Sequence, residues 1–235
     1  MGLPIQFETY LRSISRNLGM TPWIVKINRF FRGSGPYEER FSQALLAAVR
    51  SGDHVWDVGA NVGFYTRQIS ELVGDTGSVS AFEPVRACYD AITGLNLPNV
   101  HAFNMALGDS EGTLPMTVSS DPLSTTNRLV NPSEDAVNQI DVRVTTGNAI
   151  LNAGSSPAPN LVKVDVEGYE EEVLKGMTAV LARQECRAVF VEVHFGILDA
   201  RGRRQAPAAI EQLLQSLGFE TDWLDGSHIS ATKPA

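Results

Sequence analysis

The stretch from His54 to Thr66 constrains the fold of this chain more than any other part of its sequence. It combines a short apolar segment, a turn with two glycines and the start of a helix. Glycine can adopt positive φ and lets the backbone approach a ligand closely, while a helix N-terminus offers free N–H groups to an anion. This succession predicts the first strand, turn and helix of an α/β sheet that holds a nucleotide-like cofactor.

Two acids indicate the kind of cofactor. Asp57, at the end of the first predicted strand, would repel a pyrophosphate but would attract the ammonium group of an amino-acid moiety, as in S-adenosylmethionine. Asn61 also replaces the second glycine of the dinucleotide spacing G-x-G-x-x-G. Glu83 ends a second apolar run and can accept hydrogen bonds from both ribose hydroxyls. The alternatives are a helix or turn cap for Asp57 and a solvated strand end for Glu83.

The composition fits a single soluble α/β domain with an N-terminal extension. Of 235 residues, 43% are hydrophobic and 20% are charged, and no apolar stretch reaches the length of a membrane helix. The net charge of −8 argues against nucleic acid as a substrate. No signal-peptide pattern is present, and Cys88 and Cys186 indicate buried thiols rather than a disulfide or zinc site. We therefore expect a cytoplasmic protein that acts on a small molecule, without a membrane or nucleic-acid partner.

Strand and helix patterns alternate along most of the chain. This alternation predicts a doubly wound, mostly parallel Rossmann-like sheet in residues 51–235, with antiparallel edge strands within 219–232 and a helical extension in residues 1–50. Further strands are expected at 78–82, 100–104, 161–164 and 188–193, and helices at 38–49, 64–72, 86–96, 170–181 and 207–217.

Two segments are candidates for contact with an acceptor. The polar loop at 119–127 lies between extended segments at 114–118 and 139–144, and we expect it either to face the acceptor or to be a mobile surface loop. The extension could pack against the main sheet, cap the acceptor pocket or exchange between the subunits of a homodimer.

Acids also follow the later strands. Asp165 and Glu167 come after the strand at 161–164, and Glu192 and His194 end the strand at 188–193. Ligands sit at the carboxyl ends of parallel strands, so these side chains are candidates for catalysis. A hydroxyl must lose its proton during methylation, and His194 is the first candidate base because its unperturbed pKa is about 6.5. Asp165 is the second candidate.

Two other interpretations of these acids remain open. Glu167 and Glu170 could cap the helix that follows them. Asp165, Glu192 and His194 could instead bind a divalent cation, although we assign no metal from the sequence. The basic patch Arg201–Arg204 is either a solvated loop or a clamp for a phosphate-bearing acceptor such as a nucleotide sugar.

With these residues in view, residues 53–196 resemble the FkbM family of S-adenosylmethionine-dependent methyltransferases. The segments that carry the resemblance are Asp57–Thr66, Ala81–Pro84, Lys163–Glu170 and Glu192–His194. One departure is Val144–Gly147, where the family pattern has a Thr-Leu-Asp type of sequence. The resemblance implies a class I methyltransferase sheet and O-methylation of sugars or secondary metabolites.

The resemblance also implies roles for individual residues. Asp57 and Gly59 would hold the methionine end of the cofactor, Glu83 the ribose, and the segment Asn104–Leu107 the adenine, with strand-end capping as an equal alternative for Asn104. The full cofactor set is Asp57, Gly59, Asn61, Gly63, Phe64, Tyr65, Thr66, Glu83, Pro84, Asn104, Ala106 and Asp165. The catalytic set is His194, Asp165, Glu192 and Glu167.

The leading hypothesis is therefore an S-adenosylmethionine-dependent O-methyltransferase that acts on a sugar or natural product. An NAD-linked oxidoreductase on the same type of sheet is one rival, because a fold does not determine a function. A non-catalytic module that binds S-adenosylmethionine is the other.

Overall fold

The computed structural model describes residues 36–118, 128–129 and 139–234. The chain divides into two compact units, Met1–Gln43 and Ala44–Ala235. Of the first unit, only the beginning of α3 (Pro36–Ala48) is described, and α3 corresponds to the helix expected at 38–49. The rest of the predicted extension and the polar loop at 119–127 lie outside the described residues. The second unit contains the sheet and all the predicted site residues.

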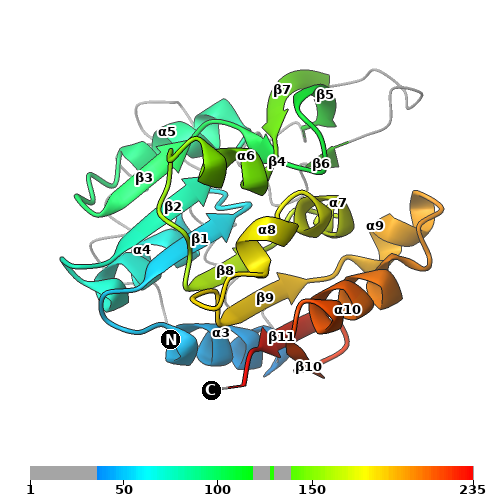
Figure 1. Cartoon of the computed structure of the whole chain (residues 1–235). Helices are drawn as coiled ribbons and strands as arrows, with labels where there is room; N and C mark the ends of the chain where they lie inside the picture. The colour runs from blue at the N-terminus through cyan, green and yellow to red at the C-terminus, as the bar shows by residue number, and fades with distance from the viewer. Residues whose placement is uncertain (1–35, 119–127, 130–138, 235) are drawn as a thin grey trace. The chain divides into compact units, whose positions relative to one another are not determined.

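Seven strands form the central sheet, in the order β10-β11-β9-β8-β1-β2-β3 (Figure 1). The five strands from β3 to β9 in this order are parallel, whereas β11 runs antiparallel to both β9 and β10. The prediction of a mostly parallel sheet with antiparallel pairing at one edge is confirmed. The strands are β1 (His54–Val58), β2 (Ser78–Phe82), β3 (Val100–Phe103), β8 (Leu161–Val164), β9 (Ala188–Glu192), β10 (Glu220–Trp223) and β11 (His228–Thr232).

The central strands are apolar along their length because both faces of the sheet are covered. Every residue of β2 and β8 is buried. Trp56 and Phe82 pack edge to face, with 5.3 Å between their ring centroids. Two buried charged side chains depart from this pattern, Asp57 in β1 and Lys163 in β8, which are 0% and 2% exposed. A buried ammonium group needs charged partners, and these partners belong to the site.

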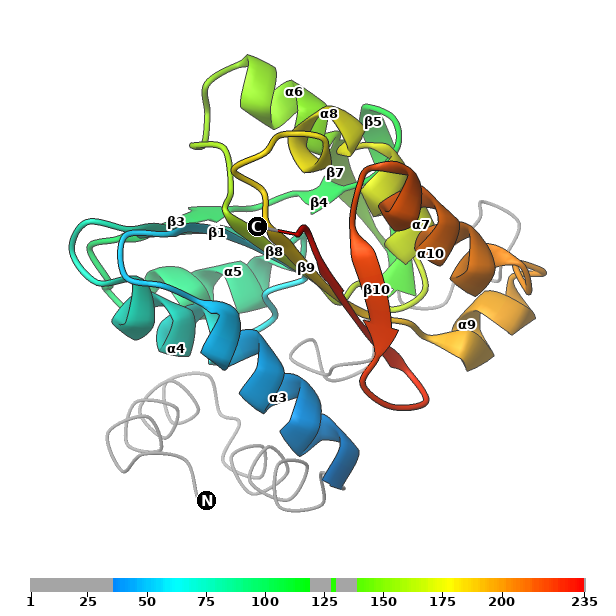
Figure 2. The ribbon, with the colours of Figure 1, turned by 60° about the horizontal axis from the view of Figure 1, so that its bottom comes forward.

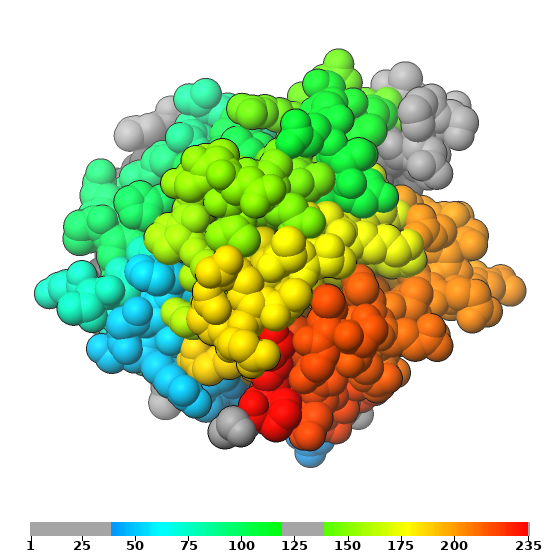
Figure 3. Space-filling view, in the orientation of Figure 1, coloured from blue at the N-terminus to red at the C-terminus, as the bar shows by residue number. Residues whose placement is uncertain are grey.

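Helices form a layer on each face of the sheet. α4 (Phe64–Val73) and α5 (Arg86–Thr93) cover one face, while α6 (Gly147–Asn152), α8 (Thr178–Leu181) and α10 (Ala206–Ser216) lie on the other (Figure 2). In Figure 3 this second face is filled by the green, yellow and orange segments, and little of the sheet is visible beneath them. Among the described helices, none has the length and apolar character needed to cross a membrane.

The helix expected at 170–181 is two helices, α7 (Glu170–Lys175) and α8. The break lies at Gly176, where an added Cβ would be 1.7 Å from the carbonyl oxygen of Gly108. Asn148 N also donates a hydrogen bond to Gly176 O, at 2.9 Å. The backbone of another segment therefore approaches the chain here, which a side-chain pattern could not reveal. The short helices α6 and α9 (Phe195–Ala200) were not expected either.

A second, smaller sheet has the strand order β4-β7-β5-β6. β5 (Gly112–Thr117) and β7 (Gln139–Thr145) are antiparallel neighbours, which confirms the two extended segments expected on either side of the polar loop. β4 (Ala106–Leu107) and β6 (Arg128–Leu129) complete the sheet.

The register of the central sheet brings the ends of its strands together. Val58 pairs with both Phe82 and Val164, and Val164 pairs with Val191. The residues that follow β1, β2, β8 and β9 therefore meet at one edge of the sheet. The site is built at this edge.

Candidate active site at the carboxyl ends of the strands

The turn after β1 brings two backbone segments into contact. Gly59 has φ +76°, and a Cβ at this position would lie 1.8 Å from the carbonyl oxygen of Asp165. Gly63, with φ +82°, precedes α4, and Asn61 also adopts a positive φ of 49°. The glycine turn predicted from the sequence is therefore present. At Gly59 its backbone packs directly against the end of β8.

Asp57 is completely buried and has two partners. Thr66 Oγ1 donates a hydrogen bond to its Oδ2 at 2.6 Å, and Lys163 Nζ lies 3.1 Å from its Oδ1. Lys163 Nζ also donates to Gly59 O at 3.0 Å and lies 5.3 Å from the centre of the Tyr65 ring. Burial alone would lower the pKa of Lys163, but the charges of Asp57 and Asp165 raise it above its usual value.

The burial of Asp57 bears on its expected contact with the methionine end of a cofactor. A fully buried carboxylate that is neutralised by Lys163 offers no surface to the ammonium group of a cofactor. Asp57 instead fixes the lysine, and the lysine holds the carbonyl group of the glycine turn.

Glu83, after β2, is held by the backbone. Its Oε2 accepts a hydrogen bond from Asn61 N and its Oε1 accepts one from Val85 N, each at 2.8 Å. Burial raises the pKa of Glu83 to about 7, although both backbone hydrogen bonds oppose this shift. The carboxylate therefore has a fixed orientation at the place where the sequence predicted a ribose contact.

Asn104 supports the same loop. Its Nδ2 donates to the carbonyl oxygens of Glu83 and Pro84, at 3.0 and 2.9 Å. Of the two roles expected for Asn104, this contact matches the cap at a strand end. Ala106, also expected near the adenine, is buried in β4. Phe64 and Tyr65 open α4 and pack edge to face, with ring centroids 5.2 Å apart.

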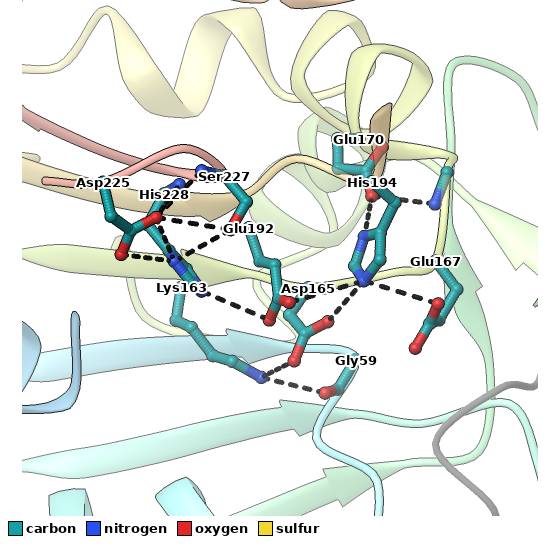
Figure 4. A network of polar contacts seen from close by, with 11 residues as sticks. Gly59, Lys163, Asp165, Glu167, Glu170, Glu192, His194, Asp225, Ser227 and His228 are labelled. Atoms are coloured by element: carbon teal, nitrogen blue, oxygen red, sulfur yellow. Dashed lines mark hydrogen bonds and ion pairs between the residues drawn. The ribbon is translucent and has the colours of Figure 1, made fainter. Parts of the chain in front are cut away.

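Three carboxylates surround His194 at the ends of β8 and β9, and we call these four residues the His194 cluster (Figure 4). His194 Nε2 lies 3.4 Å from Glu167 Oε2, 3.6 Å from Glu192 Oε1 and 3.9 Å from Asp165 Oδ1. The other ring nitrogen, Nδ1, is 2.7 Å from Oε1 of the buried Glu170. The predicted catalytic residues are therefore neighbours, and Glu170 orients the imidazole from behind.

The charges in the His194 cluster change the expected proton chemistry. Burial would lower the pKa of His194, but the hydrogen bond to Glu170 and the charges of Asp165 and Glu167 raise it to about 10. The pKa of Glu167 is raised to about 7, first by burial and then by the neighbouring carboxylates. Burial also raises the pKa of Asp165, which Lys163 partly offsets. These charges favour a protonated His194 unless a cation replaces the proton on Nε2, whereas the expectation of a neutral base assumed an unshifted pKa.

A second histidine extends this network and was missed in the sequence. His228 is 3% exposed, and its Nδ1 lies 2.8 Å from Asp225 Oδ1. Its Nε2 faces Glu192 Oε2 at 3.6 Å. The only signal in the sequence was an acid and a histidine on either side of the last hairpin turn, which is too common a pattern to indicate a site. His228 thus fixes Glu192 from the side of β11.

The loop between β8 and α7 is held in an unusual conformation. Glu167 has φ +53°, and Gly168, with φ +89°, has no room for a Cβ because Ile197 of α9 would be 2.5 Å away. Gly168 N donates to Glu170 Oε1 at 2.8 Å, and the Arg201 guanidinium donates to Gly168 O. This support places Glu167 beside His194. Glu170 accepts a hydrogen bond near the helix start, as the capping interpretation expected, but it also holds His194.

The basic patch Arg201–Arg204 is not available as a phosphate clamp. Arg203 pairs with Glu171 and Glu172 of α7, at 2.5 and 2.7 Å, and Arg201 also contacts Glu172, at 3.3 Å. Arg204 pairs with Asp199. Each arginine already faces a carboxylate, so the patch connects the α9–α10 corner to α7. The solvated-loop interpretation also fails for Arg201, whose side chain is 7% exposed.

The cofactor and catalytic sets meet at Lys163. Its Nζ lies 3.1 Å from Asp57 Oδ1 on one side and 3.4 Å from Asp165 Oδ2 on the other. Cys88 and Cys186 are buried thiols, as expected. The loop at 119–127, expected to face the acceptor, lies outside the described residues.

Comparison with known proteins identifies a family and two relatives. A family model described as "Methyltransferase FkbM domain" matches residues 57–221. The chain is 30% identical over 167 residues to the hexuronic acid methyltransferase AglP of Haloferax volcanii, an alignment that covers 68% of this chain and 64% of AglP. It is 29% identical over 177 residues to the methyltransferase sdnD of Sordaria araneosa, covering 60% of this chain and 67% of sdnD. The chain thus spans slightly less than two thirds of AglP.

Solved structures share the fold at low sequence identity. SMU.1697c of Streptococcus mutans, solved in complex with S-adenosylhomocysteine, has a TM-score of 0.52 at 12% identity, over 86% of this chain and 99% of its own. A protein of Clostridium thermocellum assigned as an rRNA methylase has a TM-score of 0.51 at 11% identity, over 86% and 98% of the two chains. Both likenesses concern the architecture of the sheet and its helices.

Proposed function

The chain belongs to the FkbM methyltransferase family, and from this premise we propose that it transfers the methyl group of S-adenosylmethionine to a hydroxyl of a sugar or a related small acceptor. S-adenosylmethionine is the cofactor of this family. The observation that carries the proposal is the position of the His194 cluster directly beside the glycine turn, to which Gly59 and Lys163 connect it.

The cofactor occupies the ends of β1 and β2 in this proposal. Glu83 accepts hydrogen bonds from the ribose hydroxyls, because its two backbone donors fix its orientation and leave lone pairs free on both oxygens. The backbone of the glycine turn lies against the methionine end, where Gly59 permits close approach. S-adenosylmethionine held by these groups would supply the reactive methyl group, and Asp165 at the end of β8 lies against the glycine turn.

The acceptor occupies the ends of β8 and β9. Carboxylate oxygens accept hydrogen bonds from hydroxyls, and a sugar presents several adjacent hydroxyls to such a group. The resemblance to AglP, which acts on a hexuronic acid, supports the sugar class. Three carboxylates within 3.9 Å of His194 Nε2 would repel the carboxylate of a uronic acid unless a cation lay between them.

The transfer itself is a displacement at the methyl carbon. The bond from carbon to the acceptor oxygen forms as the bond from carbon to sulfur breaks, and the carboxylate of Asp165, the second candidate base, accepts the hydroxyl proton and passes it to solvent. The products are S-adenosylhomocysteine, a methyl ether and a proton. The residues of this chain contribute by holding the oxygen in line with the methyl group and by keeping negative charge near the hydroxyl as it loses its proton.

Product analysis with labelled cofactor tests this proposal. Purified protein is incubated with methyl-labelled S-adenosylmethionine and a panel of neutral glycosides, uronic acids and amines, and the products are identified by mass spectrometry. We expect label in a methyl ether of a sugar and none in the amines. Asp165→Asn should lose transfer while still binding S-adenosylhomocysteine.

Two outcomes would overturn the proposal. Transfer to nitrogen alone would place the protein in another class of methyltransferase. Cofactor binding with no transfer to any hydroxyl acceptor, together with unchanged cellular function of Asp165→Asn, would favour the non-catalytic binding module.

A further inference from the structure

We propose that Asp165, Glu167 and His194 bind a divalent cation of the Mg²⁺ and Mn²⁺ class. The use of this ion in catalysis rests on the proposed O-methylation, whereas its binding does not. The ligand set differs from the set considered in the sequence, because Glu167 replaces Glu192. Three features of the structure carry the inference.

The first feature is the spacing of the ligand atoms. One oxygen each of Asp165 and Glu167 and one ring nitrogen of His194 all lie within 4.8 Å of one another. In an octahedral site with bonds of about 2.1 Å, neighbouring ligand atoms are about 3.0 Å apart and opposite ones about 4.2 Å. The distances from Nε2, 3.4 Å to Glu167 and 3.9 Å to Asp165, fall between these two values. A single ion can therefore contact all three groups after small side-chain rotations.

The second feature is that Nε2 has not closed onto any of its neighbours. Within residues 36–118, 128–129 and 139–234, no hydrogen bond to this nitrogen is formed, and the surrounding carboxylate oxygens stay at 3.4 to 3.9 Å. A charge-assisted hydrogen bond would be about 2.7–2.9 Å long. On the same ring, Nδ1 approaches Glu170 to 2.7 Å. The three carboxylate oxygens thus surround Nε2 at similar distances, and none of them is a close hydrogen-bond partner.

The third feature is the way the imidazole is oriented. Glu170 is fully buried, lies outside the ligand set and contacts Nδ1. Metal-ligating histidines usually donate their second N–H to such a carboxylate, which fixes the ring and turns the other nitrogen toward the metal. Glu170 is itself fixed by Gly168 N at 2.8 Å. Figure 4 shows Nε2 pointing away from Glu170 and toward the three carboxylates.

The charges of the surroundings agree with an ion at this place. The ammonium group of Lys163 contacts Asp165 but is shared with Asp57. Glu192 has His228 as a separate partner, which leaves it beside the site and not in the ligand set. Oxygen ligands with one imidazole suit Mn²⁺ and Mg²⁺ better than the softer metals, which favour thiolates. An ion here would also bridge the cluster to a hydroxyl or carboxylate of a sugar acid.

Mn²⁺ binding to the metal-depleted protein tests the inference without cofactor or acceptor. We expect wild type to bind one Mn²⁺ per chain in a titration followed by electron paramagnetic resonance. Spin-echo spectra of the bound ion should show coupling to one imidazole nitrogen. Glu167→Gln should weaken binding at least tenfold, and His194→Gln should also remove the nitrogen signal. The matched control is Glu111→Gln, at an exposed glutamate that takes no part in the site.

Each outcome decides the inference. No saturable binding by wild type, an unchanged affinity of Glu167→Gln, or a bound ion without nitrogen coupling would overturn it. Binding of S-adenosylhomocysteine, measured in parallel, tests whether the variants are folded. If a variant does not fold, the presence or absence of nitrogen coupling in wild type decides whether His194 binds the ion. If wild type binds no Mn²⁺ and methyl transfer persists in excess chelator, the cation site is contradicted and the proposed function is supported. If wild type binds Mn²⁺ but transfers methyl groups to no hydroxyl, the cation site is supported and the proposed function is contradicted.

Discussion

The two halves of the site use acidic side chains in opposite ways. At the ends of β1 and β2, each acid has its own donors: Thr66 and Lys163 for Asp57, and two backbone N–H groups for Glu83. At the ends of β8 and β9, three carboxylates face one imidazole nitrogen, and the nearest of their oxygens is 3.4 Å from it. In the half proposed to hold the cofactor, each acid thus has close partners of its own, whereas the carboxylates of the His194 cluster share one imidazole nitrogen.

This difference distinguishes acids that hold a preformed geometry from acids that can bind a ligand. Acids that are fully paired hold the shape of a turn and orient a few lone pairs, as Glu83 does. Acids that are left facing one another raise each other's pKa, and such groups gather at functional sites. Lys163 is the element common to both halves, because its ammonium group lies between Asp57 and Asp165.

The largest effect is expected from removing this shared charge. Lys163→Met leaves Asp57 buried without its cation, which should lower the free energy of unfolding by about 3–5 kcal/mol. Urea denaturation measures the change. The control is Lys175→Met, since Lys175 is half exposed and forms a surface ion pair worth less than about 1 kcal/mol. Equal losses of stability in the two variants would contradict the claim that Lys163 is needed to neutralise a buried carboxylate.

The glycine turn should show the next largest effect. Gly59→Ala combines a positive φ with a Cβ 1.8 Å from the backbone of Asp165, so we expect a loss of about 2–3 kcal/mol and weaker binding of S-adenosylhomocysteine. Denaturation and calorimetry measure the two quantities. Gly226→Ala is the matched control, because open space surrounds that position. Full cofactor affinity in Gly59→Ala would show that the turn does not lie against the cofactor.

The pH dependence of cofactor binding tests the role of Glu83. Its carboxyl group has its full capacity to accept hydrogen bonds only when it is ionised, and burial raises its pKa to about 7. Affinity for S-adenosylhomocysteine should therefore rise as the pH increases from 6 to 8, because protonated Glu83 loses acceptor capacity below its pKa. Glu83→Gln should bind about tenfold more weakly and lose this pH dependence. A pH profile that is the same in wild type and variant would remove Glu83 from the ribose site.

The smallest effect is expected at His228. His228→Asn removes the contact to Glu192 without touching the cofactor half, so kcat for methyl transfer should fall about threefold with unchanged cofactor affinity. Steady-state kinetics with both substrates varied will separate the two parameters. A change in cofactor KM alone would show that the halves are not independent.

The sequence was sufficient to predict the sheet because the signals there are local. Buried apolar strands such as β2 and β8 and the glycine turn are recognisable from a few adjacent residues. The identity of the acids at the strand ends followed from the same pattern, since all parallel strands end at one edge.

The partners of these acids were not predictable, because they come from distant parts of the chain. Lys163 reads as one residue of an apolar strand, yet it neutralises Asp57 across the sheet. The shifted pKa of His194 depends on Glu170, which reads as the first residue of a helix. The arginines at 201 and 203 reach α7 through a corner that no periodic pattern describes. The sequence predicted which acids and which histidine lie at the strand ends, and the tertiary structure adds their partners and the direction of their pKa shifts.

A crystal structure of the protein with S-adenosylhomocysteine is the most direct test of the account. We predict the ribose hydroxyls on Glu83, the homocysteine chain along the turn at Gly59, and the sulfur atom facing Asp165 and the His194 cluster. A cofactor whose ribose lies away from Glu83, or whose sulfur points away from the ends of β8 and β9, would contradict the division of the site into these two halves.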